Sequence, residues 1–162
     1  MHPPNHFNPD HHLNLAEASV VTTEDVRAAW ERTYAELQQH LLGVGPSATL
    51  YLVFGIQGAG KTTWVQRNAS RFGPHAVFLD GPLPSRRHRS RALSLAREAG
   101  CKVIGVWLNT SFEMALARNS TRPGLARIRE ETMRHVQEQL EPPSTDEGFS
   151  EVIHVTVPEN MA

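Results

Sequence analysis

Cysteine is almost absent from this chain of 162 residues. The single one, Cys101, excludes an intramolecular disulfide, so the fold must be held together by its core and its hydrogen bonds. A chain of this length can bury a sufficient core without disulfides or a structural metal. One unpaired thiol also fits a reducing compartment, and we expect Cys101 to be a small buried apolar residue.

Long apolar runs are missing as well. No stretch approaches the roughly 20 residues that a membrane-spanning helix needs. The first residues have neither the basic n-region nor the apolar h-region of a secretory signal. The chain also contains no internal repeat and no low-complexity segment. We therefore expect a cytoplasmic, soluble protein without a membrane partner.

The chain has little net charge, with 16 Lys and Arg against 17 Asp and Glu. Charge therefore gives no general argument for binding nucleic acid or an anionic membrane. Its distribution is uneven, because residues 1–49 hold six acidic and two basic side chains, whereas residues 81–100 hold five arginines and one glutamate. The acidic N-terminal segment is a candidate surface for docking a protein partner.

A glycine-rich segment follows a continuously apolar stretch, LYLVF at residues 50–54, which predicts a parallel strand buried on both faces. The next residues fit the P-loop pattern G-x-x-x-x-G-K-[ST], in which backbone N–H groups and a helix N-terminus surround a phosphate. Lys61 would reach the β- and γ-phosphates of ATP, and we expect its ammonium to be solvated when the loop is empty. The predicted nucleotide-binding residues are Gly55, Gln57, Gly58, Ala59, Gly60, Lys61, Thr62 and Thr63.

Two further residues predict a Mg²⁺ site beside the loop. Thr62 offers the hydroxyl that P-loop proteins place on the metal. Asp80 follows a short apolar strand at residues 76–79, and an acidic residue at the carboxyl end of such a strand holds the metal or its water. The alternative for Asp80 is a turn residue before Gly81.

Arginines gather in two places. Arg86, Arg87 and Arg89 lie in the first turns of a predicted helix, where cations oppose the helix dipole, so an anionic substrate is one explanation and a solvated basic face is the other. Arg118 and Arg122 end a later helix, where the dipole alone favours them. In P-loop kinases the same place carries arginines that close over the transferred phosphate. The predicted catalytic residues are Lys61, Asp80, Arg118 and Arg122.

Strand and helix patterns alternate after residue 49, which predicts an α/β fold, an open parallel sheet with helices on both faces. The expected strands are residues 50–54, 76–79, 102–108 and 151–157. We divide the chain into an N-terminal tail and helix, residues 1–48, and a domain of residues 49–162. The helix begins at a capping box formed by Thr22 and Asp25. Before it, residues 1–19 are expected to form a mobile tail or an arm that lies on another surface. The histidines of this segment suggest a metal site, but no cysteine and no regular ligand spacing supports it; they are His2, His6, His11 and His12.

Residues 49–157 resemble the kinase domain of polynucleotide kinases, above all the kinase half of polynucleotide kinase 3′-phosphatases. The likeness is carried by GIQGAGKTTW, by FLDGPLPSRRHRSRALSLAREAGCKV, and by ALARNSTR followed by EQLEPPSTDEGFSEVIHV. It implies a P-loop kinase that uses ATP and Mg²⁺ and moves the γ-phosphate to a hydroxyl. The acceptor would be a polynucleotide 5′ end or, since Asp80 and the arginines after it also resemble adenylyl-sulfate kinases, a small metabolite.

The chain departs from that family between the P-loop helix and the strand at residues 76–79, where it is shorter by about one strand–helix unit. In the family this unit carries an Asp that activates the acceptor hydroxyl, and that Asp has no counterpart here. Asp80 would then serve both the metal and the acceptor. Alternatively, the protein is a regulatory or partner-binding nucleotide-binding module without efficient transfer, or an NTP hydrolase.

Overall fold

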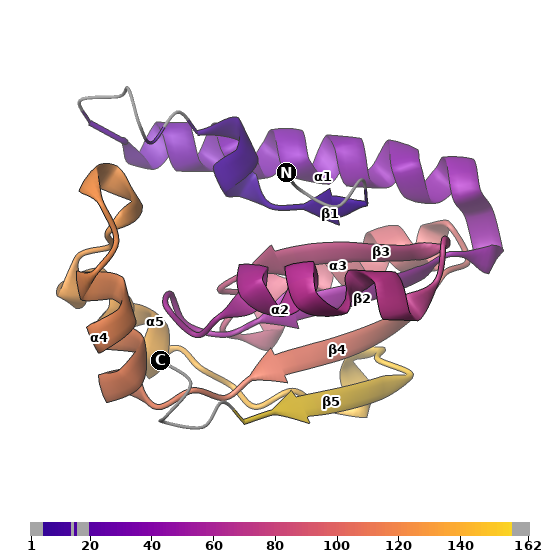
Figure 1. The fold of residues 1–162 in the computed structure, drawn as a ribbon. Coiled ribbons are helices and arrows are strands. Elements are labelled where there is room, and N and C mark those ends of the chain that lie inside the picture. Colours follow the sequence, from indigo (N-terminus) through magenta and orange to yellow (C-terminus); the bar gives the residue numbers. More distant parts are fainter. Residues whose placement is uncertain (1–4, 14, 16–19, 157–162) are drawn as a thin grey trace.

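The computed structural model describes residues 5–13, 15 and 20–156. It confirms the predicted fold class, an α/β fold with a parallel sheet and helices on both of its faces (Figure 1). The sheet has five strands in the order β1-β3-β2-β4-β5, and all four strand pairs are parallel. The strands are β1 (His6–Phe7), β2 (Thr49–Phe54), β3 (Ala76–Gly81), β4 (Lys102–Leu108) and β5 (Glu151–Val155).

The helices connect these strands in the expected order. They are α1 (Thr23–Val44), α2 (Lys61–Asn68), α3 (Arg86–Glu98), α4 (Phe112–Ser120) and α5 (Glu130–Glu138). The 3-10 turn η4 (Gly124–Ala126) precedes α5. In the described part of the chain, no helix is both long and apolar enough to cross a membrane.

Each face of the sheet has its own hydrophobic core. Alternate residues of a strand point to opposite faces, so Leu50, Leu52 and Phe54 of β2 pack with α1 and α3, whereas Tyr51 and Val53 pack with α2, α4 and α5. α2 and α3 therefore lie on opposite sides of the sheet (Figure 1). Because β2 is buried on both faces, the segment that follows it starts from a rigid strand.

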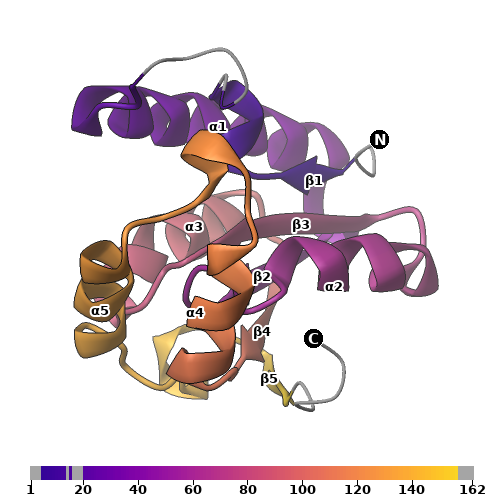
Figure 2. The ribbon, with the colours of Figure 1, turned by 60° about the vertical axis from the view of Figure 1, so that its left-hand side comes forward.

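Helix α1 belongs to the first of these cores. It begins at the predicted capping box, in which Thr22 accepts a hydrogen bond from the backbone of Asp25 and the Asp25 side chain accepts one from the backbone of Thr22. Its residues Leu37 and Leu41 are fully buried against the sheet and α3. Figure 2 shows α1 running along the edge of the molecule next to β1.

The N-terminal arm, which we define as residues 5–13, lies against the domain. β1 pairs with β3 at the edge of the sheet, and the backbone N–H of Phe78 donates to the carbonyl of Asn5 at 2.8 Å. The sequence did not predict this strand, because two residues in a segment rich in His, Asn and Pro have no periodicity. After α2 the chain passes through η3 (Ala69–Phe72) directly into β3, as expected for the shortened fold, so the arm takes the position next to β3.

Two neighbouring leucines test how far α1 is part of the core. Leu41 is fully buried, whereas Leu42 is 56% exposed. We expect Leu41→Ala to lower the free energy of unfolding by about 2–5 kcal/mol, and Leu42→Ala to change it by less than about 0.5 kcal/mol. Urea denaturation followed by circular dichroism measures both. Equal and small effects would show that α1 contributes little to the stability of the sheet.

Candidate functional site

The glycine-rich segment that the sequence predicts to be a P-loop lies between β2 and α2. Gly58 and Gly60 have left-handed φ values of 84° and 99°. A Cβ on Gly58 would lie 2.3 Å from the backbone oxygen of Ala115, so only glycine fits there. Gly60 is the N-cap of α2, and no side chain caps this end of the helix within the described ranges. Its first backbone N–H groups are thus left for an anion.

Lys61 is held by the loop itself. Its ammonium donates to the backbone oxygens of Gly55 at 2.8 Å and Ile56 at 3.0 Å. Burial lowers the pKa of Lys61 to about 8, and the negative charge of Asp80 partly opposes this shift. The expectation that Lys61 is solvated in the empty loop holds only in part, because loop carbonyls accept two of its N–H groups while the residue stays partly exposed.

Asp80 and Thr62, the predicted metal ligands, lie together. Asp80 is the last residue but one of β3, and it is only 2% exposed. The hydroxyl of Thr62 donates to its Oδ2 at 3.3 Å. A hydroxyl and a carboxylate are the hard oxygen ligands that suit Mg²⁺, so the chemistry of this pair fits that ion.

Two further residues form hydrogen bonds with the carboxylate of Asp80, and the sequence did not predict either contact. The side-chain N–H of Asn8 donates to Oδ1 at 2.8 Å, and the Nε2 of His6 forms a short hydrogen bond with Oδ2. Both come from the N-terminal arm, 72 and 74 residues away in the sequence. No sequence pattern indicated that His6 or Asn8 would contact Asp80. The histidines of the N-terminal segment had been considered only as possible metal ligands. His2 lies outside the described residues.

Arg118 and Arg122 are brought to the same place. An N–H of Arg118 donates to the backbone oxygen of Ala59 at 3.4 Å, so its guanidinium lies over the P-loop. Arg122 lies near enough that its positive charge lowers the pKa values of both Lys61 and Asp10. The loop therefore has three cationic groups around it.

Asp10 is a further carboxylate at this site that the sequence did not identify. Burial and the charge of Asp80 raise the pKa of Asp10, whereas the charges of Lys61 and Arg122 lower it. It lies in the 3-10 turn η1 (Pro9–His12), which Asn8 caps by accepting a hydrogen bond from the Asp10 backbone at 2.8 Å. The Asn-Pro pair before it is a turn signal that could have placed it, but nothing in the sequence placed that turn beside the P-loop.

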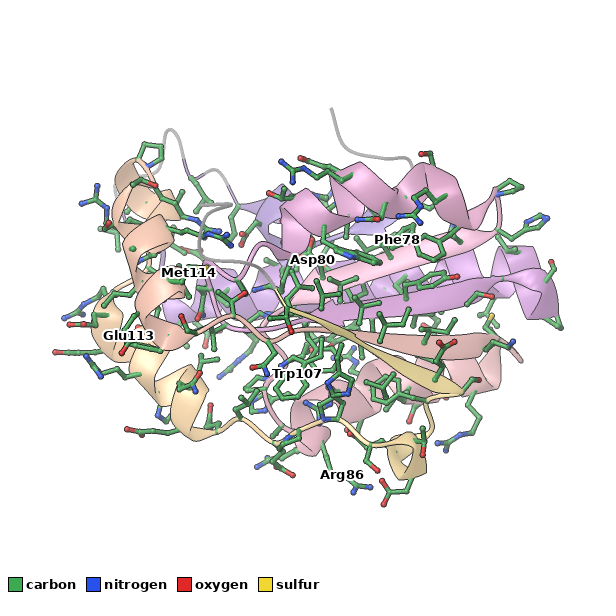
Figure 3. The ribbon with its side chains drawn as sticks, turned by 60° about the horizontal axis from the view of Figure 1, so that its bottom comes forward. Phe78, Asp80, Arg86, Trp107, Glu113 and Met114 are labelled. Atoms are coloured by element: carbon green, nitrogen blue, oxygen red, sulfur yellow. The ribbon has the colours of Figure 1, made fainter. Side chains whose placement is uncertain are left out.

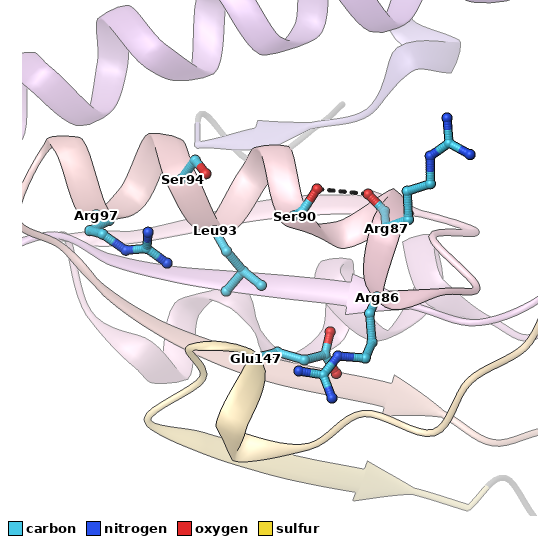
Figure 4. Close-up of a pocket in the computed structure, with 7 residues that line it drawn as sticks. All are labelled: Arg86, Arg87, Ser90, Leu93, Ser94, Arg97 and Glu147. Carbon is cyan, nitrogen blue, oxygen red and sulfur yellow. Dashed lines mark hydrogen bonds between the residues drawn. The ribbon is translucent and has the colours of Figure 1, made fainter.

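The arginines at the start of α3 lie elsewhere. Arg86 and Arg87 line a surface hollow of about 310 Å³ between α3 and η5 (Thr145–Glu147), in which Arg86 turns toward Glu147 and Arg87 points away (Figure 4). Arg86 also pairs with Asp146 at 3.2 Å. Figure 3 shows Arg86 well apart from Asp80. The structure therefore does not bring these two arginines to the P-loop.

Arg89 is a structural residue rather than a substrate contact, which corrects the expectation from the sequence. It is fully buried and lies over the ring of Phe54. Its five N–H groups are all used within the protein, because they donate to both carboxylate oxygens of Glu147 and to the backbone oxygens of Leu83, Pro84 and Glu141. No donor is left for a ligand.

Comparisons with known proteins add little. No family model and no curated protein matches the chain. Among solved structures, an unliganded sugar kinase from Janibacter sp. matches with a TM-score of 0.48 at 15% sequence identity, over 72% of this chain and 90% of the other. At this level of similarity the match carries no argument about function, which has to be drawn from the site.

The buried pair of Arg89 and Glu147 leads to a stability prediction. Arg89→Met would leave the Glu147 carboxylate buried without its partner, so we expect a loss of about 3–5 kcal/mol in the free energy of unfolding. Arg32→Met is the matched control, because Arg32 forms an exposed pair with Glu36 on α1, and should cost less than about 0.5 kcal/mol. Urea denaturation of both variants checks the prediction, and similar values for the two would contradict it.

Proposed function

We propose that the protein is an ATP-dependent phosphotransferase, a P-loop kinase that moves the γ-phosphate of ATP to a hydroxyl acceptor. The observation that carries the proposal is the meeting of Lys61, Thr62, Asp80, Arg118 and Arg122 around one glycine-rich loop. Lys61 and Thr62 come from α2, Asp80 comes from β3, and the two arginines come from α4 and the turn after it. Together these groups could neutralise and position a triphosphate.

The P-loop residues would bind the phosphates through their backbone. N–H groups of Gln57, Gly58, Ala59, Gly60, Lys61, Thr62 and Thr63 would surround the β-phosphate, with Gly55 providing the turn out of β2. Lys61 would exchange its two carbonyl partners for phosphate oxygens. Since the phosphates carry negative charge, they favour the charged form of Lys61 over the neutral form that burial favours.

Thr62 and Asp80 would hold Mg²⁺, directly or through its water. When bound, the ion neutralises charge on the β- and γ-phosphates. Arg118 and Arg122 would stabilise the charge on the transferred phosphoryl group from the side of α4. The resemblance to polynucleotide kinases supports a polynucleotide 5′-hydroxyl as one acceptor class and leaves a small metabolite as the other. The acidic residues of α1 remain a proposed surface for a protein partner.

A second function is supported by the contacts of Asp80. Because His6 and Asn8 occupy its carboxylate, the metal has competitors at this position. The protein would then be a nucleotide-binding regulatory module without efficient transfer. Tight ATP binding by the wild-type protein, with no transfer to any hydroxyl or to water, would favour this second function.

Lys61→Ala tests nucleotide binding. The loss of charged hydrogen bonds to phosphate, about 1.5–3 kcal/mol, corresponds to a roughly 10- to 150-fold weaker affinity for ATP. Lys102→Ala is the control, because Lys102 is exposed at the start of β4 and should leave the affinity unchanged. Isothermal titration calorimetry with Mg-ATP measures both variants.

Transfer itself is measured with γ-labelled ATP. The acceptors are 5′-hydroxyl DNA and RNA oligonucleotides, nucleosides and hexoses. We expect label in one of these classes with the wild-type protein, and none with Lys61→Ala. An absence of labelled product with every acceptor would overturn the proposed activity.

A further inference from the structure

The proposed transfer needs a group that accepts the proton of the attacking hydroxyl, and Asp80 is poorly placed to do so. Its carboxylate is buried, Oδ1 accepts from Asn8, and Oδ2 is shared by Thr62 and His6. These contacts hold Asp80 inside the sheet edge, and its remaining role under the proposed function is the metal. The acceptor side therefore requires another residue.

Asp10 is the carboxylate that the fold offers there. Two carboxylates act electrostatically on the ammonium of Lys61, and they are Asp80 and Asp10. Unlike Asp80, Asp10 keeps contact with solvent, although its surroundings desolvate its carboxyl group in part. It also lies within electrostatic reach of Arg122. Asp10 therefore lies close enough to Lys61 and Arg122 for its charge to act on the predicted phosphate site.

The arm places Asp10 by strand pairing. In the parallel register Phe7 lies opposite Leu79, so Asn8 lies level with Asp80. Asp10 follows two residues later, beyond the carboxyl ends of the strands, where open α/β sheets bind their ligands. The ends of β1 and β3 point the same way in Figure 1.

The same residues hold Asp10 in position. The side chain of Asn8 donates to Asp80 and accepts from the backbone N–H of Asp10, so it joins the two carboxylate residues. Pro9 is buried and restricts the backbone between Asn8 and Asp10. His11 packs edge-on against the ring of His6 at 5.1 Å. Asp10 is therefore part of an ordered turn.

We propose that Asp10 is the general base for the acceptor hydroxyl, an assignment that rests on the proposed function. As the hydroxyl oxygen forms its bond to the γ-phosphorus, its proton passes to the Asp10 carboxylate. The bond between the γ-phosphorus and the bridging oxygen breaks, ADP leaves with that electron pair, and Asp10 later releases the proton to solvent. The N-terminal arm then contributes a residue to the active site, although it is distant in sequence from the other residues of the site.

The electrostatic environment agrees with this role. Burial and the neighbouring Asp80 raise the pKa of Asp10 above its usual value. A base works best when its pKa approaches the working pH. Lys61 and Arg122 act in the opposite direction and limit the rise in the pKa of Asp10.

Asp10→Asn tests the assignment, because it keeps the shape of the side chain and removes its basicity. We expect transfer from γ-labelled ATP to the accepting class of the panel to fall by about 10²- to 10⁴-fold. The affinity for Mg-ATP should stay within a few-fold of wild type. Asp10→Glu should recover part of the transfer, since it restores a carboxylate. Glu98→Gln, an exposed carboxylate at the end of α3, is the control and should transfer like the wild type.

The outcomes separate this assignment from the proposed function. Transfer by Asp10→Asn within about threefold of wild type would overturn the assignment alone. Equal loss of ATP binding and transfer in Asp10→Asn, with the circular dichroism spectrum unchanged, would also overturn it, because Asp10 would then serve nucleotide binding. An absence of transfer by the wild-type protein would overturn the proposed function and the assignment together.

Discussion

The buried carboxylate of Asp80 is the interaction on which the site depends. It belongs to the last residue but one of β3, accepts from Thr62 at the start of α2, and accepts from Asn8 of the N-terminal arm. A buried carboxylate is costly unless its oxygens are hydrogen-bonded, so these segments are constrained to meet at one point. The arm, the P-loop helix and the central strands thereby hold a fixed arrangement.

The P-loop depends on this arrangement and on the sheet beneath it. β2 is buried on both faces and delivers Gly55 to a set position, and Gly58 packs directly on the backbone of Ala115 in α4. The same contact brings α4 with Arg118 over the loop. Packing of the backbone thus positions Arg118 over the glycine-rich loop.

The residues that the sequence singled out around the glycine-rich loop lie together in the fold, whereas several of their neighbours had no sequence signal. The P-loop, Thr62 and Asp80 were identified because their spacing and strand–loop–helix context are local properties. Arg89 was predicted to contact an anionic substrate because it belongs to a cluster of arginines in the sequence. In the structure it is buried against Phe54 and Glu147. Whether an arginine in a basic cluster is buried depends on residues some 58 positions away, which no local pattern contains.

The sequence by itself determined the α/β class, the order of its main strands and helices and the glycine-rich loop after β2, because hydrophobic periodicity and glycine chemistry act between near neighbours. Only the tertiary structure decided the edge of the sheet and what stands opposite the loop. A two-residue strand has no signal of its own, and its pairing with β3 brings His6, Asn8 and Asp10 to the site. Such pairing depends on long-range register, which is a property of the folded chain alone.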